Sequence, residues 1–307
     1  MSEQPPTIAP PDKPPAPFWQ RILPVPFALL ALGIVFLLYQ GLGTVLVLLL
    51  TKGEFTVASA SLIRWATLLG QLLFMLLPTI VLARLRHGNI RQSLRLTLPE
   101  PLEILVIVVA VFALQQMLQG YMTLQDAVPL PEPLRHFVDL LRRAVEMSYR
   151  LLAQASNPVE FAFVVLTVAL IPAVCEESLF RGLVQGSLEE TYGGLRGAVI
   201  AGIIFGAYHL NPFGIVPLVS LGVFFGYVVY RSRSLLLAIT AHFFNNFVAC
   251  TALYLNLDDD FIVLHPEGGA SAGMLLANFV FFALVFAAAT IVFFLMTRKE
   301  GTGPASH

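Results

Sequence analysis

The 307-residue sequence has few charged residues, only two cysteines and no cluster of basic side chains. Charged residues make up 12% of the chain, about half the share in an ordinary soluble domain, and the formal net charge is -1. So little charge argues against a soluble protein, and the lack of a basic block argues against nucleic acid as a partner. Cys175 and Cys250 fall in apolar stretches without metal-ligand spacing, which predicts small buried side chains and assigns no disulfide.

Long apolar runs take the place of the missing charge, and hydrophobic residues reach 57% of the sequence. Eight runs are predicted to cross a lipid bilayer as helices, although the fifth and sixth are short. The predicted spans are residues 25–50, 62–83, 102–119, 159–181, 196–210, 214–230, 235–256 and 272–296. The first run is too long for a signal-peptide core and is predicted to stay as a membrane helix. The predicted fold class is an all-α polytopic transmembrane bundle of about eight helices, in contact with membrane lipid.

The chain divides around these spans into five predicted parts. Residues 1–20 are rich in proline and poor in apolar side chains, which predicts a disordered tail. Residues 120–158 carry apolar side chains on one helical face and charged ones on the other, which predicts an interfacial amphipathic helix outside the hydrocarbon. N-terminal membrane helices occupy residues 21–119, a polar-containing core occupies 159–256, and the last helix with its tail occupies 257–307.

Arginines between the spans predict the orientation, because positively charged loops tend to stay in the cytoplasm. The second connection holds Arg84, Arg86, Arg91 and Arg95, and placing it inside puts both termini in the cytoplasm. The arginines of residues 120–158 then lie on the outer side and depart from the rule. The predicted location is a bacterial inner membrane with both termini cytoplasmic.

The second half of the chain places ionisable residues inside apolar spans, where each is costly and normally faces a cavity or a partner. Glu176, Glu177 and Arg181 follow a long apolar run. On a helix, Glu177 and Arg181 are four residues apart and can form an ion pair. Glu176 points about 100° away from Glu177 and is free for another task.

Two histidines and an asparagine complete the polar set. His209 lies near the end of the fifth span, just before Asn211 and Pro212, which are expected to break the helix. His242 and Asn246 are one helical turn apart on the seventh span. Both side chains can therefore reach toward one point.

Counting residues from a turn predicts that three of these groups share one depth. If Gly193 and Gly194 turn the chain between antiparallel helices, Glu176 lies 17 residues before the turn and His209 lies 15 residues after it. Both are then about 22 to 26 Å from the turn, because an α-helix rises about 1.5 Å per residue. His242 reaches a matching depth when it is counted from the arginines before its span. We expect Glu176, His209 and His242 in one layer of the bundle.

Taken singly, each residue has an ordinary structural explanation, because buried histidines and asparagines often hydrogen-bond a neighbouring helix. The cluster favours chemistry, since a carboxylate beside two histidines can activate water, stabilise an oxyanion or bind a divalent metal. The candidate metal ligands are Glu176, His209 and His242, and two imidazoles with a carboxylate suit zinc. A proton- or ion-coupled transporter is the alternative, because such groups also relay protons, although the chain shows no evident transporter repeat.

Three short segments carry a resemblance to a known family. They are Glu-Glu-Ser-Leu-Phe-Arg at 176–181, Phe-Gly-Ala-Tyr-His at 205–209 and His-Phe-Phe-Asn-Asn at 242–246. These segments resemble the EExxxR, FxxxH and HxxxN motifs of the CPBP family, also called Abi, of intramembrane metalloproteases. That family includes the type II CAAX prenyl endopeptidases. The resemblance covers about residues 159–256, which would be the catalytic core.

The resemblance implies an intramembrane endopeptidase that hydrolyses a peptide bond of a protein or peptide substrate, with or without an attached lipid. Glu176 would be the general base on water, helped by His209, while His242 and Asn246 would bind the oxyanion or a metal. The implied site consists of Glu176, Glu177, Arg181, His209, His242 and Asn246. Metal-dependent and metal-free mechanisms are both argued for the family, so zinc is left open. A third interpretation keeps the fold without catalysis, as a binding protein of the bacteriocin-immunity type.

Overall fold

The computed structural model describes residues 17–126, 128–129, 131–257 and 272–298. Within these ranges every regular element is a helix, so the predicted all-α class is confirmed. Most of the proline-rich tail predicted at residues 1–20 lies outside the described residues. The end of the chain beyond residue 298 lies outside them too.

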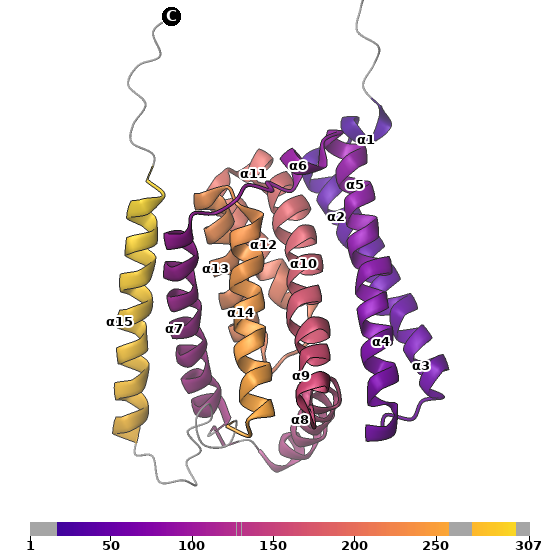
Figure 1. Cartoon of the computed structure of the whole chain (residues 1–307), viewed down its shortest axis with the longest axis vertical. Coiled ribbons are helices and arrows are strands. Elements are labelled where there is room, and N and C mark those ends of the chain that lie inside the picture. Colours follow the sequence, from indigo (N-terminus) through magenta and orange to yellow (C-terminus); the bar gives the residue numbers. More distant parts are fainter. Residues whose placement is uncertain (1–16, 127, 130, 258–271, 299–307) are drawn as a thin grey trace, which may run out of the picture.

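Among the described residues, seven helices are long and apolar enough to cross a membrane, as expected of an integral membrane protein. They stand side by side as a bundle (Figure 1). They cover Pro24–Thr51, Val57–His87, Pro101–Gln125, Pro158–Tyr192, Ile215–Ser232, Leu235–Tyr254 and Gly273–Met296. The remaining predicted span is α12, Gly194–Tyr208, which is apolar but has only 15 residues.

Three of the membrane-spanning helices are rods in which α-helical and π-helical segments alternate. In a π-helical segment each backbone hydrogen bond joins residues five apart, instead of four as in an α-helix. The first rod consists of α2 (Pro24–Phe36), the π-helical η1 (Leu37–Gly43) and α3 (Thr44–Thr51). The second consists of the 3₁₀ turn η2 (Val57–Ser59), α4 (Ala60–Gly70), the π-helical η3 (Gln71–Leu76) and α5 (Leu77–His87). The third consists of α9 (Pro158–Val164), the π-helical η4 (Val165–Leu170), α10 (Ile171–Glu177), the π-helical η5 (Ser178–Val184) and α11 (Gln185–Tyr192).

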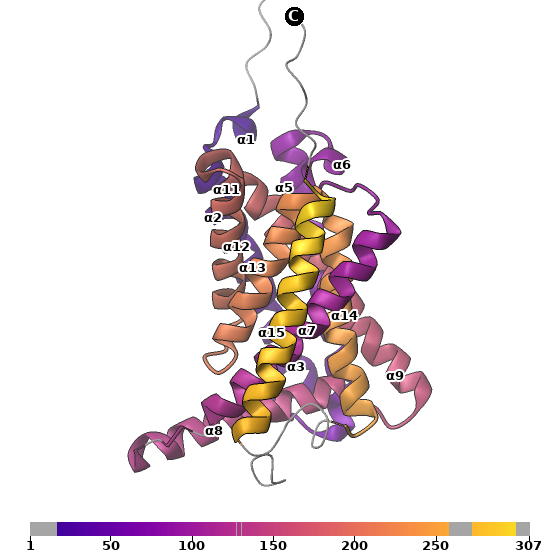
Figure 2. The same ribbon diagram turned by 90° about the vertical axis from the view of Figure 1, so that its left-hand side faces the viewer.

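The other elements are single α-helices. Those within the bundle are α7 (Pro101–Asp126), α12, α13 (Ile215–Ser232), α14 (Leu235–Tyr254) and α15 (Ala272–Met296). The short α1 (Phe18–Arg21) and α6 (Ile90–Ser93) lie at one end of the bundle. α8 (Glu132–Ala153) lies across the opposite end, as Figure 2 shows, and is the amphipathic helix expected within residues 120–158.

The third rod is longer than the span predicted for it, since it runs over Pro158–Tyr192 rather than 159–181. The predicted span ended at Arg181. In the structure Glu177 and Arg181 are fully buried and neutralise one another. The helix can therefore continue past them without leaving the bundle.

α12 and α13 form a hairpin in which glycines let two backbones touch. A Cβ added at Gly222 would come within 2.6 Å of the Gly202 carbonyl oxygen, and one at Gly226 within 2.8 Å of the Ala198 carbonyl oxygen. Small residues at such a crossing allow the close packing that holds membrane helices together. The tight hairpin fixes the end of α12, where His209 follows.

Ion pairs with at least one buried partner fasten both ends of the bundle. Arg64, on α4 and 3% exposed, pairs with Glu160 on α9 at 2.5 Å. At the other end, Glu189 on α11 pairs with Arg95 at 2.6 Å and with Arg233 at 3.1 Å. These pairs connect the third rod to segments that are distant in sequence, so they fix its position relative to the neighbouring helices.

Candidate active site

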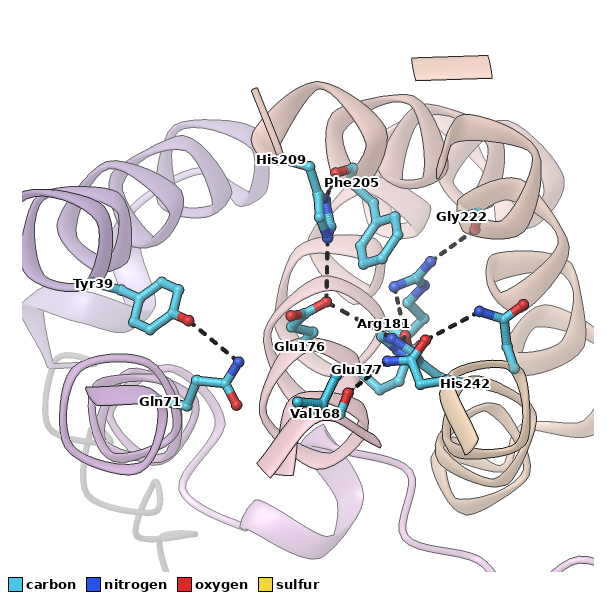
Figure 3. Close-up of polar contacts among 12 residues, drawn as sticks. Tyr39, Gln71, Val168, Glu176, Glu177, Arg181, Phe205, His209, Gly222 and His242 are labelled. Atoms are coloured by element: carbon cyan, nitrogen blue, oxygen red, sulfur yellow. Dashed lines mark hydrogen bonds and ion pairs between the residues drawn. The ribbon is translucent and has the colours of Figure 1, made fainter. Parts of the chain in front are cut away.

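Two carboxylates, two imidazoles and a guanidinium meet inside the bundle (Figure 3). Glu176 and Glu177 end α10, Arg181 lies in η5, His209 follows α12, and His242 lies in the second turn of α14. The geometry thus brings together five of the six residues that the sequence analysis selected.

Glu177 and Arg181 form a fully buried ion pair. Both side chains are 0% exposed, and Arg181 Nη1 lies 2.8 Å from Glu177 Oε1. Arg181 Nη2 also donates to the Gly222 carbonyl oxygen on α13 at 2.9 Å, and the guanidinium lies 4.3 Å from the centre of the Phe205 ring. The pair predicted from the four-residue spacing therefore also joins η5 to α12 and α13.

The Glu177 carboxylate also holds His242. Its Nδ1 lies 2.9 Å from Glu177 Oε1, and its ring stacks on that of Phe225 with centroids 5.3 Å apart. An ionised carboxylate only accepts hydrogen bonds, so Nδ1 is the donor and the ring is fixed in orientation. His242 Nε2 is left facing Glu176 Oε2 at 4.0 Å.

The backbone of α12 holds His209. Its Nδ1 lies 2.8 Å from the Phe205 carbonyl oxygen, which can only accept, so Nδ1 is again the donor. Its Nε2 lies 3.6 Å from Glu176 Oε2. α12 ends at Tyr208 and Leu210 adopts a left-handed φ of 51°, so the helix breaks where the Asn-Pro pair predicted.

Both free imidazole nitrogens therefore face one oxygen of Glu176. The Glu176 and His209 side chains are 13% and 29% exposed, whereas Glu177 is 0% exposed, so Glu176 is the carboxylate that an incoming molecule can reach. Glu176 Oε2 has no hydrogen-bond partner within the described ranges. Since two acceptors facing each other need a proton or a donor between them, this point suits a water molecule or a shared proton.

Asn246 is engaged with the third rod instead. Its Nδ2 donates to the Val168 carbonyl oxygen in η4 at 3.1 Å, and its Oδ1 accepts from Asn245 Nδ2 at 3.0 Å. Both polar atoms of the side chain thus have partners, and the contact ties α14 to η4. The oxyanion role that the resemblance implies for Asn246 stays a prediction.

The zinc site predicted from Glu176, His209 and His242 is not seen. Two imidazoles and a carboxylate are chemically suited to zinc, and each imidazole is oriented by a second partner, as metal-binding histidines usually are. Yet no group of three His, Cys, Asp or Glu side chains in the described part of the chain is arranged to hold a metal ion.

The segment that carries this cluster also matches a known family. Residues 158–248 match the model of the family described as type II CAAX prenyl endopeptidase Rce1-like. These residues form a domain of that family. Every residue of the implied site lies in the family domain, which covers less than a third of the chain. No curated protein and no solved structure matches the chain.

Membership of the domain in this family implies a peptidase that acts on a peptide substrate in a lipid environment. The helices before α9 lie outside the family domain, yet they bring polar groups to the site that the sequence analysis missed. Gln71, on η3 and 4% exposed, donates from Nε2 to the Tyr39 hydroxyl on η1 at 3.3 Å. Figure 3 shows both side chains extending from their helices toward Glu176. A lone glutamine in an apolar span was the available signal, because polar groups in hydrocarbon are costly.

Proposed function

We propose that the protein is an intramembrane endopeptidase of the CAAX-protease type in which Glu176 activates the attacking water. The observation that supports this most directly is the convergence of His209 Nε2 and His242 Nε2 on Glu176 Oε2, at 3.6 and 4.0 Å. Glu177 and Arg181 are fully buried and act indirectly, because Glu177 fixes the His242 ring while Arg181 neutralises Glu177.

In the proposed reaction Glu176 takes a proton from water while the water oxygen bonds to the carbonyl carbon of the scissile peptide. The carbonyl oxygen becomes an oxyanion. The protonated His242 imidazole stabilises this oxyanion by donating a hydrogen bond from Nε2. His209 orients the water and Glu176. The carbon–nitrogen bond then breaks, and the leaving amine takes the proton held by Glu176, so that Glu176 returns to its starting state.

A cleavage assay on the purified full chain in liposomes tests the proposal. The probes are fluorescence-quenched peptides ending in cysteine and three further residues, with and without a prenyl group on the cysteine. Cleavage that survives a strong chelator is the result expected from the Glu176 mechanism. Cleavage lost to the chelator and restored by zinc would assign the two histidines to a metal instead. Proton-driven solute uptake without cleavage of either probe would favour the transporter.

The path of the chain supports the predicted orientation. α1 and the last turn of α15 lie at the same end of the bundle, together with α6 and α11 (Figure 1). Arg86 and Arg95 lie at this end too, since they pair with Glu190 and Glu189 of α11. Basic residues favour the cytoplasmic side, so we propose that both termini face the cytoplasm of a bacterial inner membrane.

Reporter fusions check this orientation. Green fluorescent protein at the C-terminus is expected to fluoresce, because it folds in the cytoplasm. Alkaline phosphatase inserted at Ser156, between α8 and α9, is expected to be active, because it needs the oxidising outer side. The reverse pattern of the two reporters would contradict the proposed topology.

A further inference from the structure

The helices that precede the family domain place a polar pair beside its site. Gln71 is 4% exposed, and its Nε2 donates to the Tyr39 hydroxyl at 3.3 Å. The Tyr39 ring lies against Gly70, 3.7 Å from where a Cβ would stand on that glycine, which keeps the first two rods close together. Both polar residues lie in π-helical segments, η1 and η3, and such segments often occur at functional sites.

This pair lies on the side of the site that Glu176 faces. η3, which begins with Gln71, packs directly against α10, which carries Glu176. In Figure 3, Tyr39 and Gln71 extend toward Glu176 from the side opposite His242. The N-terminal rods therefore place a polar pair on this side of the family domain.

Tyr208 adds a third group from the family domain itself. It precedes His209, and its ring packs edge-on against Phe36 of α2 and Phe180 of η5, with centroids 5.4 and 5.2 Å away. The ring contacts explain where Tyr208 packs, but they give its hydroxyl nothing to bind.

Gln71, Tyr208 and Glu176 each leave a buried polar atom without a hydrogen-bond partner among the described residues. These atoms are Gln71 Oε1, the Tyr208 hydroxyl oxygen and Glu176 Oε2. A buried polar atom left unpaired is costly, and native structures contain few of them. Unpaired atoms on residues next to a site that Glu176 leaves partly exposed suit a ligand with both donors and acceptors.

An extended peptide main chain has the complementary groups. A peptide segment in lipid must leave its helix before it can be cut, and its freed N–H and C=O groups then need partners, because hydrocarbon offers none. Gln71 Oε1 can only accept and therefore suits a main-chain N–H, whereas the Tyr208 hydroxyl can donate to a main-chain carbonyl.

We propose that Tyr39, Gln71 and Tyr208 form a subsite that binds the substrate main chain beside the scissile bond. Gln71 Oε1 accepts a hydrogen bond from a substrate N–H. The Tyr39 hydroxyl holds the Gln71 amide in position by accepting a hydrogen bond from Gln71 Nε2. Tyr208 donates to a neighbouring main-chain carbonyl. The subsite rests on the proposed function, since Glu176 defines where the scissile bond lies, and it gives the two N-terminal rods a part in substrate binding.

Depsipeptide probes test the hydrogen bond directly. In each probe an ester oxygen replaces one main-chain N–H of the cleaved peptide, and the replacement is moved along the chain one bond at a time. Wild-type protein is expected to lose about tenfold in kcat/KM at the position that Gln71 binds. Gln71→Leu is expected to cleave that probe and the parent peptide equally well. A purely structural role for Gln71 would lower both rates together and keep their ratio.

Matched variants keep the result interpretable. Gln40→Leu makes the same change next to Tyr39 and is expected to keep the wild-type ratio of kcat/KM between parent peptide and ester probe. Gln71→Met replaces Gln71→Leu should the leucine variant fail to fold.

If Gln71→Leu keeps the full wild-type ratio at every position of the ester, the subsite is wrong, although cleavage still supports the proposed function. If wild-type protein cleaves nothing, the proposed function fails, and fluorescence anisotropy measures binding of the same probes. If wild-type protein binds one ester probe more weakly than the parent peptide and Gln71→Leu does not, the result supports the subsite. If wild-type protein binds every ester probe as tightly as the parent peptide, the result overturns it.

Discussion

Glu176→Gln is expected to lower kcat/KM for peptide cleavage by about 10²- to 10⁴-fold, the contribution typical of a general acid–base group. Glutamine keeps the shape of the side chain but cannot take the proton from water or return it to the leaving amine. The substitution leaves the buried pair of Glu177 and Arg181 intact, so the protein should fold normally. The measurement is cleavage of the quenched peptide by each variant, at matched amounts of folded protein.

Glu190→Gln is the matched control for this substitution. Glu190 lies on α11 of the same rod, its side chain is 44% exposed, and it pairs only loosely with Arg86 at 3.6 Å. Arg86 keeps its hydrogen bonds to the Trp19 and Ile22 carbonyl oxygens in this variant, so cleavage should stay near the wild-type rate. A folded Glu176→Gln protein that cleaved as fast as Glu190→Gln would show that another group activates the water.

Much of this arrangement could be predicted from the sequence, because helices have a fixed rise and a fixed angle per residue. The four-residue spacing of Glu177 and Arg181 predicted their ion pair, and it left Glu176 on another face. Counting from Gly193 placed Glu176 and His209 at one level, and their side chains lie 3.6 Å apart. Gly193, with a φ of 83°, does separate α11 from α12 as the count assumed.

The rest depends on contacts between helices that are distant in sequence, which no local spacing specifies. Asn246 shares a face with His242, yet the backbone of η4 takes its amide, because the third rod packs there against α14. Gln71 is more than a hundred positions before Glu176, and only the packing of η3 on α10 brings them together. The length of the third rod was missed for a different reason, since Glu177 and Arg181 neutralise one another within their own helix and do not mark the membrane surface.

Arg181→Met is expected to lower the free energy of unfolding by about 3 to 5 kcal/mol, because removing one partner of a buried ion pair leaves the other charge uncompensated. The stranded charge is Glu177, which is 0% exposed. Methionine also loses the hydrogen bond to the Gly222 carbonyl oxygen that joins η5 to α13. Denaturant unfolding in detergent micelles measures the change. Arg196→Met, an exposed substitution on α12, should change the free energy of unfolding by less than about 0.5 kcal/mol.

A double variant separates the stabilising role of the pair from its role in orienting the site. Adding Glu177→Gln to Arg181→Met removes the stranded charge, so much of the lost unfolding free energy is expected to return. Cleavage is not expected to return with it, because Glu177 Oε1 is also the group that orients His242 Nδ1 at 2.9 Å. A neutral amide holds the imidazole less firmly and no longer stabilises its protonated form. Recovery of both stability and cleavage would mean that Glu177 and Arg181 only hold the helices together.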